Sequence, residues 1–268
     1  MRQDGAEAKG VWASGAAYDP YMGRWSRRVA AEFVAWLGVP PESRWLDVGC
    51  GTGALSRAVL DVGSPKQVVG IDLSPGYIEY ARHNVVDERL SFRLGDAHAL
   101  PTGLDRFDAV VSGLALNFMA EPHDALAAMA RAARAGGLVA VYVWDYADKM
   151  QLLRYFWDAA VTLDPKVSGL DEAKRSLVCD PASLTRLYEG AGLGGVETRP
   201  IDVAARFTDF NDYWSPFLGG QGTVASYAMS LSEEGRRELR ELIKARLPVA
   251  PDGSIEMTIR AWAAKGGR

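Results

Sequence analysis

A glycine-rich stretch at residues 45–53, WLDVGCGTG, constrains the fold of this chain more than any other feature. A short apolar run ends in glycines at every second position, and a helical pattern begins directly after Gly53. Glycine lets the backbone turn sharply and approach a ligand closely, and the first amides of the following helix would point at that ligand. The stretch therefore predicts a strand, a nucleotide-binding turn and a helix over residues 54–60.

Acidic residues accompany three of the predicted strands near this turn. Asp47 stands directly ahead of the glycines, Asp72 ends the apolar run 67–72, and Asp96 follows the run 90–94. In nucleotide-binding βαβ units, a carboxylate after the second strand binds the ribose. A single acid at a strand end often caps a helix or a turn instead. Three acids at these places together favour a ligand site.

The order of these motifs closely resembles that of the class I S-adenosylmethionine-dependent methyltransferases. The runs 107–112 and 134–139 extend the resemblance, which covers roughly residues 25 to 145. Within the family, the chain is similar to small-molecule enzymes such as the quinone-biosynthesis C-methyltransferases. The resemblance implies transfer of a methyl group from S-adenosylmethionine to a small, largely apolar acceptor.

Two alternatives to this function remain open from the sequence. The glycine spacing also fits the dinucleotide fingerprint of an NAD(P)-dependent oxidoreductase, although no Tyr-x-x-x-Lys pair follows it. A non-catalytic S-adenosylmethionine-binding or scaffold protein would keep the same fold without turnover.

The resemblance also implies which residues bind the cofactor. Asp47 helps to hold its ammonium, Asp72 accepts both ribose hydroxyls, and Asp96 accepts from the adenine amino group. An N-terminal segment, residues 1–26, either covers apolar surface or forms a lid over the methionine end of the cofactor. The full set of expected cofactor residues is Tyr21, Arg24, Asp47, Gly49, Cys50, Gly51, Asp72, Leu73, Asp96 and Ala97.

No general base stands out in the sequence. His98, two residues after Asp96, is one weak candidate, and Asn117 is another that could orient an acceptor but cannot deprotonate it. We expect no metal, because hard cations need several convergent oxygen ligands and Asp145 and Asp148 lack an obvious partner acid.

The fold class expected from these patterns is α/β. Strand and helix patterns alternate with short loops, which predicts a parallel sheet with helices on both faces, and 268 residues suit one domain. The resemblance implies a Rossmann-like, doubly wound, mostly parallel sheet of seven strands with a terminal antiparallel strand. Beyond the turn, the expected strands are 67–72, 90–94, 107–112, 138–144, 196–207 and 255–263, and the expected helices include 123–134, 149–163, 181–188 and 232–247.

Two helical inserts, 146–180 and 208–250, are expected to cap the end of the sheet. Ligand pockets in open sheets lie beyond the carboxyl ends of the strands, so aromatic side chains there could line an acceptor pocket or form ordinary core. The candidates for this pocket are Asn117, Trp144, Tyr146, Trp157, Tyr213 and Trp214.

The charge and hydropathy of the chain disfavour several classes of binding partner. Thirty basic and 34 acidic residues give a net charge of -4, and no block of Lys or Arg forms the basic surface that nucleic acids require. No apolar run reaches the length of a membrane span, and the N-terminus carries no hydrophobic signal core. We therefore expect a cytoplasmic protein with a small-molecule partner and neither nucleic acid nor membrane. The oligomeric state stays open.

Overall fold

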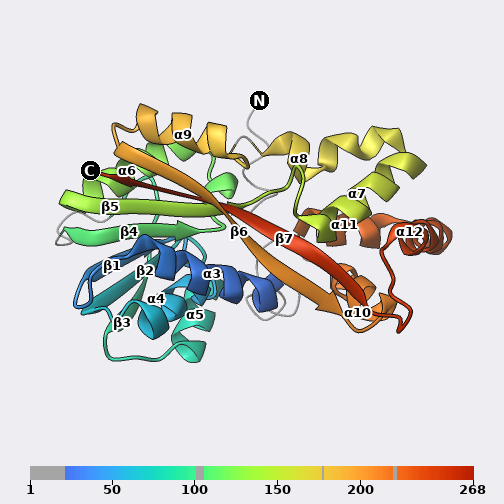
Figure 1. Cartoon of the computed structure of the whole chain (residues 1–268), viewed down its shortest axis with the longest axis horizontal. Helices are drawn as coiled ribbons and strands as arrows, with labels where there is room; N and C mark the ends of the chain where they lie inside the picture. Colours follow the sequence, from blue (N-terminus) through green and yellow to red (C-terminus); the bar gives the residue numbers. More distant parts are fainter. Residues whose placement is uncertain (1–21, 101–105, 177, 220–221) are drawn as a thin grey trace.

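The sheet is the frame of the molecule. The computed structural model describes residues 22–100, 106–176, 178–219 and 222–268. Its seven strands lie in the order β3-β2-β1-β4-β5-β7-β6 (Figure 1). Their bounds are β1 Arg44–Val48, β2 Gln67–Asp72, β3 Leu90–Leu94, β4 Phe107–Gly113, β5 Ala133–Trp144, β6 Gly194–Phe207 and β7 Ile255–Gly267. The pairs β1–β2, β2–β3, β1–β4 and β4–β5 are parallel, whereas β7 runs antiparallel to β5 and β6. The predicted fold class is thus confirmed.

Helices cover both faces of this sheet. Neighbouring residues of β1 show why, since Trp45 and Leu46 are both buried but belong to different apolar clusters, as expected when alternate side chains face opposite sides. The first cluster contains buried residues of α3 and α4, and the second contains those of α6 and α9. The helices up to this point are α3 Arg24–Leu37, α4 Ala54–Val62, α5 Pro75–Asn84, η2 Leu116–Phe118, α6 Pro122–Ala132 and α9 Pro181–Gly190.

Side-chain caps fix where several helices begin. The hydroxyl of Ser74 accepts from the amide of Tyr77 with Pro75 in the first turn, and Asp180 accepts from the amide of Ser183. These bonds satisfy amides that the helix itself leaves unpaired. Asp180 therefore caps α9, which begins at Pro181 as predicted.

Several predicted boundaries differ from the observed ones, and the junction of α6 and β5 is the clearest case. The helix expected over 123–134 ends at Ala132, because Ala133 already pairs with Phe107 in the sheet. The side chain of Arg134 then donates to Asp108 on the neighbouring strand, with Nε 2.6 Å from Oδ1. Gly136, with a φ of 70°, lies inside a bulged start of β5 rather than at a helix end.

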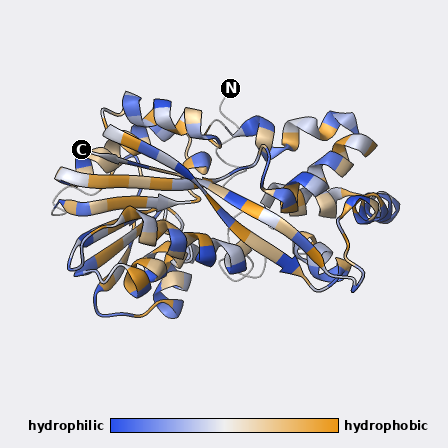
Figure 2. Cartoon of the chain, viewed as in Figure 1, coloured by the Kyte–Doolittle hydropathy of each residue, from blue (hydrophilic) through white to orange (hydrophobic). Residues whose placement is uncertain are grey.

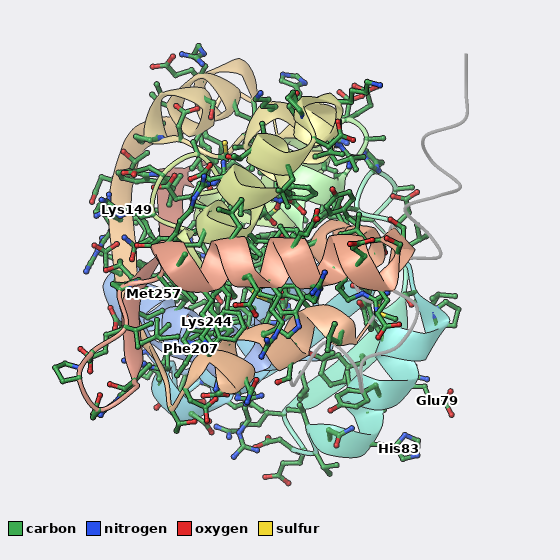
Figure 3. All side chains as sticks on the ribbon, turned by 90° about the vertical axis from the view of Figure 1, so that its right-hand side faces the viewer. Glu79, His83, Lys149, Phe207, Lys244 and Met257 are labelled. Atoms are coloured by element: carbon green, nitrogen blue, oxygen red, sulfur yellow. The ribbon has the colours of Figure 1, made fainter. Side chains whose placement is uncertain are left out.

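The two inserts gather at one end of the sheet, to the right in Figure 1. They contain α7 Gln151–Leu163, η3 Pro165–Leu170 and α8 Glu172–Arg175, and then α10 Phe210–Trp214, η4 Ser215–Leu218, α11 Gly222–Ser230 and α12 Glu233–Arg246. Figure 3, which looks at this end, shows α12 lying across it with Lys244 on the helix. The Nζ atom of Lys244 lies 5.9 Å from the centre of the Phe210 ring.

Aromatic rings join the inserts to each other. Phe156 on α7 lies within 5.1–6.4 Å, between ring centres, of Trp157, Trp214, Phe217 and Tyr227. This aromatic cluster is continuous with the core under α3. The strands β6 and β7, which reach the inserts, alternate between hydrophobic and hydrophilic residues (Figure 2). Within the described ranges, no helix combines the length and apolar character needed to cross a membrane.

The position of Phe156 predicts a large effect on stability. Phe156 is fully buried, so Phe156→Ala removes its contacts with the aromatic cluster and leaves a cavity, which should lower the free energy of unfolding by about 3–5 kcal/mol. Chemical denaturation would measure the change. Leu163→Ala is the matched control on the same helix, because Leu163 is 45% exposed. Similar losses in the two variants would contradict this account of the inserts.

Candidate active site

The glycine turn after β1 is shaped by positive backbone angles and by its contact with β2. Gly49, Gly51 and Gly53 have φ angles of 72°, 51° and 87°, which side chains other than glycine rarely allow. A Cβ atom on Gly49 would lie 2.6 Å from the Cβ of Ala115. The carbonyl oxygen of Ile71 accepts from the amides of residues 49 and 50, at 2.7 and 3.0 Å. The turn therefore has one shape, fastened to the end of β2.

A cavity opens beside this turn. It offers about 220 Å³ to water-sized molecules, far more than the ~10–15 Å³ that one water needs. One half is lined by the turn and its neighbours, namely Asp47, Gly49, Cys50, Gly51, Thr52, Ala54, Leu55, Asp72 and Tyr77. The other half is lined by Met22, Ser26, Gly113, Leu114, Ala115, Phe118, Tyr142, Trp144, Tyr146, Leu153, Glu172, Gly222 and Thr223. The second half draws on both inserts.

Asp47 brings a buried acid to the cavity. Its side chain is fully buried, and one oxygen, Oδ2, accepts from the hydroxyl of Ser56 at 2.7 Å. The other oxygen, Oδ1, is buried without a hydrogen-bond partner among the described residues. Burial, with a smaller effect from the charge of Asp72, raises the pKa of Asp47 to about 7. A cationic ligand group would compensate this carboxylate.

Asp72 ties the turn to the start of α5. Its Oδ2 accepts from the amide of Gly51 at 2.9 Å, and its Oδ1 accepts from the amide of Ser74 at 2.8 Å. Burial raises the pKa of Asp72, while these two hydrogen bonds act in the opposite direction. A carboxylate has about four acceptor positions, so both oxygens retain capacity for ligand hydroxyls.

Cys50 contributes backbone rather than reactivity. Its side chain is buried in the turn, and burial raises the pKa of the thiol well above its ordinary value. Since the thiolate is the nucleophilic form, Cys50 is chemically quiet here. The cavity thus receives Asp47, Gly49, Cys50, Gly51 and Asp72 from the predicted cofactor set.

The N-terminal part of that set is placed differently. Arg24 begins α3, but its guanidinium packs over the rings of Trp25 and Phe207, at 4.2 and 4.8 Å. Its Nη1 atom lies 3.4 Å from Oδ1 of Asp212. Arg24 is therefore directed to the second insert and not to the cavity wall. Tyr21 and the lid segment before it fall outside the described residues, so the lid stays a prediction.

The residues expected around the adenine lie at the same edge of the sheet, beyond the cavity wall. Asp72 pairs with Leu94 across β2 and β3, which places Asp96 two residues past that pair. Oδ1 of Asp96 accepts from the amide of His98 and contacts its ring Nδ1, both at 2.9 Å. Leu73 is exposed and Ala97 is half-buried. His98 is thus held by Asp96, away from the cavity lining.

The other weak candidate for chemistry touches the cavity indirectly. Asn117 lies on η2, and its Nδ2 is 3.5 Å from the hydroxyl of Tyr146, which lines the cavity. His83, in contrast, projects outward from α5 in Figure 3, and its ring nitrogen Nδ1 is hydrogen-bonded to the carbonyl oxygen of Glu79. Within the described residues, no histidine lines the cavity, and neither does Asn117. These side chains therefore present no general base to it.

Only some of the residues expected to form an acceptor pocket line the cavity. Trp144 and Tyr146 line the cavity, whereas Trp157, Tyr213 and Trp214 lie behind its wall in the aromatic core. Packing explains the difference. Trp157 and Trp214 both pack on Phe156, and Tyr213 and Trp214 both pack on Phe217. The Tyr213 hydroxyl also donates to the carbonyl of Leu152 at 2.9 Å. For these three residues the ordinary-core interpretation holds.

Several residues that line the cavity were not predicted from the sequence. Tyr77 could have been found, because it lies in the first turn of the capped helix after Asp72. Leu114 has a φ of 59°, an unusual strain that often marks functional sites, but no pattern reveals it. Glu172 and Thr223 come from irregular inserts, where no periodicity marks a residue as facing a ligand.

Comparison with known proteins identifies the family. Residues 46–141 match the methyltransferase domain model. A demethylmenaquinone methyltransferase from Renibacterium salmoninarum is 38% identical over 118 residues, which are 44% of this chain and 46% of that protein. An uncharacterized protein of Mycobacterium tuberculosis is 30% identical over 232 residues, covering 83% of this chain and 81% of that protein.

A solved structure shows the same fold. The phosphoethanolamine N-methyltransferase 2 of Haemonchus contortus, in complex with S-adenosyl-L-methionine, has a TM-score of 0.57 and 16% identity, covering 94% of this chain and 56% of that chain. The chain spans about half the length of the first curated relatives it matches. With the glycine turn, the acids and the matches to the methyltransferase domain model and to named methyltransferases, the chain belongs to the class I S-adenosylmethionine-dependent methyltransferases.

The raised pKa of Asp47 predicts a pH-dependent gain of stability on its removal. The pKa is 3.8 in an ordinary environment and about 7 in the fold, so between these values the native state binds more protons and loses stability as pH rises. Asp47→Asn, which resembles the protonated acid, should be more stable than the parent by about 2–4 kcal/mol at pH 8. The difference should shrink toward pH 4.

Denaturant titrations across this pH range would test the prediction. Asp61→Asn serves as the control, since Asp61 lies exposed on α4 in an ion pair with Arg57. A stability difference for Asp47→Asn that does not grow with pH would contradict the buried, uncompensated carboxylate.

Proposed function

We propose that this chain transfers the methyl group of S-adenosylmethionine to a small, largely apolar acceptor. The observation that carries the proposal is one cavity lined at one side by the glycine turn with Asp47 and Asp72, and at the other by the inserts. The relative that bears the name demethylmenaquinone methyltransferase agrees with an acceptor of this kind. Neither a nucleic acid nor a protein is needed as partner in this proposal.

The residues of the turn fit the cofactor. The buried Oδ1 of Asp47, without a partner among the described residues, suits the ammonium of the methionine moiety. The free acceptor positions of Asp72 suit ribose hydroxyls, and Asp96, Leu73 and Ala97 would surround the adenine. At Gly49 a side chain would collide with Ala115, so the bare backbone is left to approach the ligand.

Positioning is the main task of the protein in this reaction. When bound, the cofactor supplies a methyl group made electrophilic by the neighbouring sulfonium. The chain itself has to align the acceptor with that group, and alignment of two reactants can supply several kcal/mol of the barrier. The apolar wall formed by Phe118, Trp144 and Leu153 excludes water from the acceptor.

The function can be tested directly with the full chain. S-adenosylmethionine and S-adenosylhomocysteine should bind in calorimetry and NAD should not. With a panel of quinols, phenols and amines, S-adenosylhomocysteine should form only when an accepted compound is present, and mass spectrometry should find the methylated product. Binding of NAD alone would instead support an oxidoreductase. Cofactor binding without turnover on any acceptor would support a non-catalytic binder.

Asp72 provides a sharper test of the cofactor site. Asp72→Asn removes the charge that strengthens hydrogen bonds to ribose hydroxyls, and charge-assisted bonds are worth about 1.5–3 kcal/mol each. The dissociation constant for S-adenosylhomocysteine should therefore rise about tenfold to a hundredfold. Calorimetry measures the change, and thermal unfolding checks that the turn survives. Unchanged affinity, or an equal loss in the exposed Asp61→Asn control, would remove Asp72 from the site.

A further inference from the structure

Glu172 lines the cavity but is not among the residues expected to bind the cofactor. It begins α8 in the first insert and lines the cavity together with Leu153 of α7 and Thr223 of α11. The inference drawn from it rests on the proposed methyltransferase function and concerns the acceptor half of the same cavity.

One hydrogen bond orients this carboxyl group, because the indole nitrogen of Trp157 donates to its Oε2. Trp157 is only 1% exposed, so its position is fixed by the aromatic core. The side chain of Thr223 lies close enough to Glu172 to stabilise its charged form. A carboxyl oriented in this way is preorganised to receive a ligand, because less side-chain freedom remains to be lost.

The charge of Glu172 is not balanced by a neighbouring base. Asp171, next to it in sequence, takes the guanidinium of Arg154, with Nη2 2.7 Å from Oδ2. Across the described ranges, Glu172 itself forms no ion pair, and the charged residues that line the cavity are Asp47, Asp72 and Glu172. All three are acidic. An anionic acceptor would meet repulsion here, whereas a cation would be attracted.

The surroundings of Glu172 define the rest of the ligand. Phe118, Trp144 and Leu153 present apolar surface to the same cavity. A carboxylate that is partly removed from water and has no cation beside it is unfavourable, and a ligand that brings positive charge on an apolar body removes that penalty. We propose that the acceptor is an amine on a small apolar body and that Glu172 binds its ammonium group.

The chemistry of such an acceptor balances with the residues present. The ammonium passes one proton to the Glu172 carboxylate, which frees the nitrogen lone pair. The nitrogen–carbon bond then forms as the carbon–sulfur bond breaks, and the bonding pair remains on sulfur as a thioether. The product is an N-methylammonium ion.

The environment of Glu172 suits this proton transfer. Burial first, and then the charge of Asp171, raise the pKa of Glu172, which makes it a better proton acceptor. Arg154 forms its ion pair with Asp171 and not with Glu172. Burial raises the pKa of Tyr227 on α11, so Tyr227 stays neutral and adds no charge.

Three probes of similar shape test the inference: 2-phenylethylamine, 2-phenylethanol and phenylacetate. With the full chain saturated with S-adenosylhomocysteine, calorimetry should show that the amine binds most tightly and phenylacetate most weakly. Glu172→Gln should weaken amine binding about tenfold to a hundredfold and leave the alcohol and the cofactor product unaffected. Thr223→Val, which keeps the carboxyl but removes a neighbouring hydroxyl, should cause a smaller loss.

Glu238→Gln is the matched control, because Glu238 is exposed on α12, and it should change nothing. Failure of the amine to bind, equal binding of amine and alcohol by the parent, or an amine preference retained in Glu172→Gln would overturn the inference. If Glu172→Gln does not fold, the inference is tested by the amine preference of the parent protein and by the loss of amine binding in Thr223→Val. Intact binding of S-adenosylhomocysteine with no amine preference would overturn only this inference, whereas loss of that binding in the parent would overturn the proposed function.

Discussion

The carbonyl oxygen of Ile71 accepts from two consecutive amides of the glycine turn, and the rest of the site depends on this contact. It holds the end of β1 against the end of β2, so Asp47 and Asp72 come close enough for the charge of one to raise the pKa of the other. Asp72 then fastens the turn from the opposite side through the amide of Gly51. The turn is therefore held to β2 both by backbone bonds and by the side chain of Asp72.

Local patterns explain why this half of the molecule could be predicted from sequence. Strands β2 and β3 match their expected bounds, since each is a short run ended by a turn residue and paired with its neighbour along the chain. The position of the Arg24 side chain could not be predicted in this way. It packs on the ring of Phe207 and pairs with Asp212, and both residues lie far along the sequence. In the inserts, the helices could be predicted because their apolar residues recur at helical spacing. Which aromatic side chain faces the cavity could not, because packing between distant segments decides it.

Two acids, Asp47 fully buried and Glu172 partly buried, give the cavity its electrostatic character. Asp47 and Glu172 both have pKa values raised chiefly by burial, which means that the fold bears a free-energy penalty for them. Such penalties are typical of functional sites, where stability is given up for ligand binding. Their placement at different parts of one cavity, one on the turn and one on an insert, is consistent with two ligand groups held at once.

The surroundings of Glu172 also show how the insert side of the cavity is assembled. Trp157 and Glu172 belong to the first insert and Thr223 to the second, so both inserts contribute to the environment of the carboxyl. The aromatic cluster around Phe156 supplies that packing through Trp214, Phe217 and Tyr227. None of these residues belongs to the glycine turn. Substitutions in the inserts can therefore change the acceptor that is bound while the cofactor half keeps its geometry, which follows from building the two halves on separate parts of the chain.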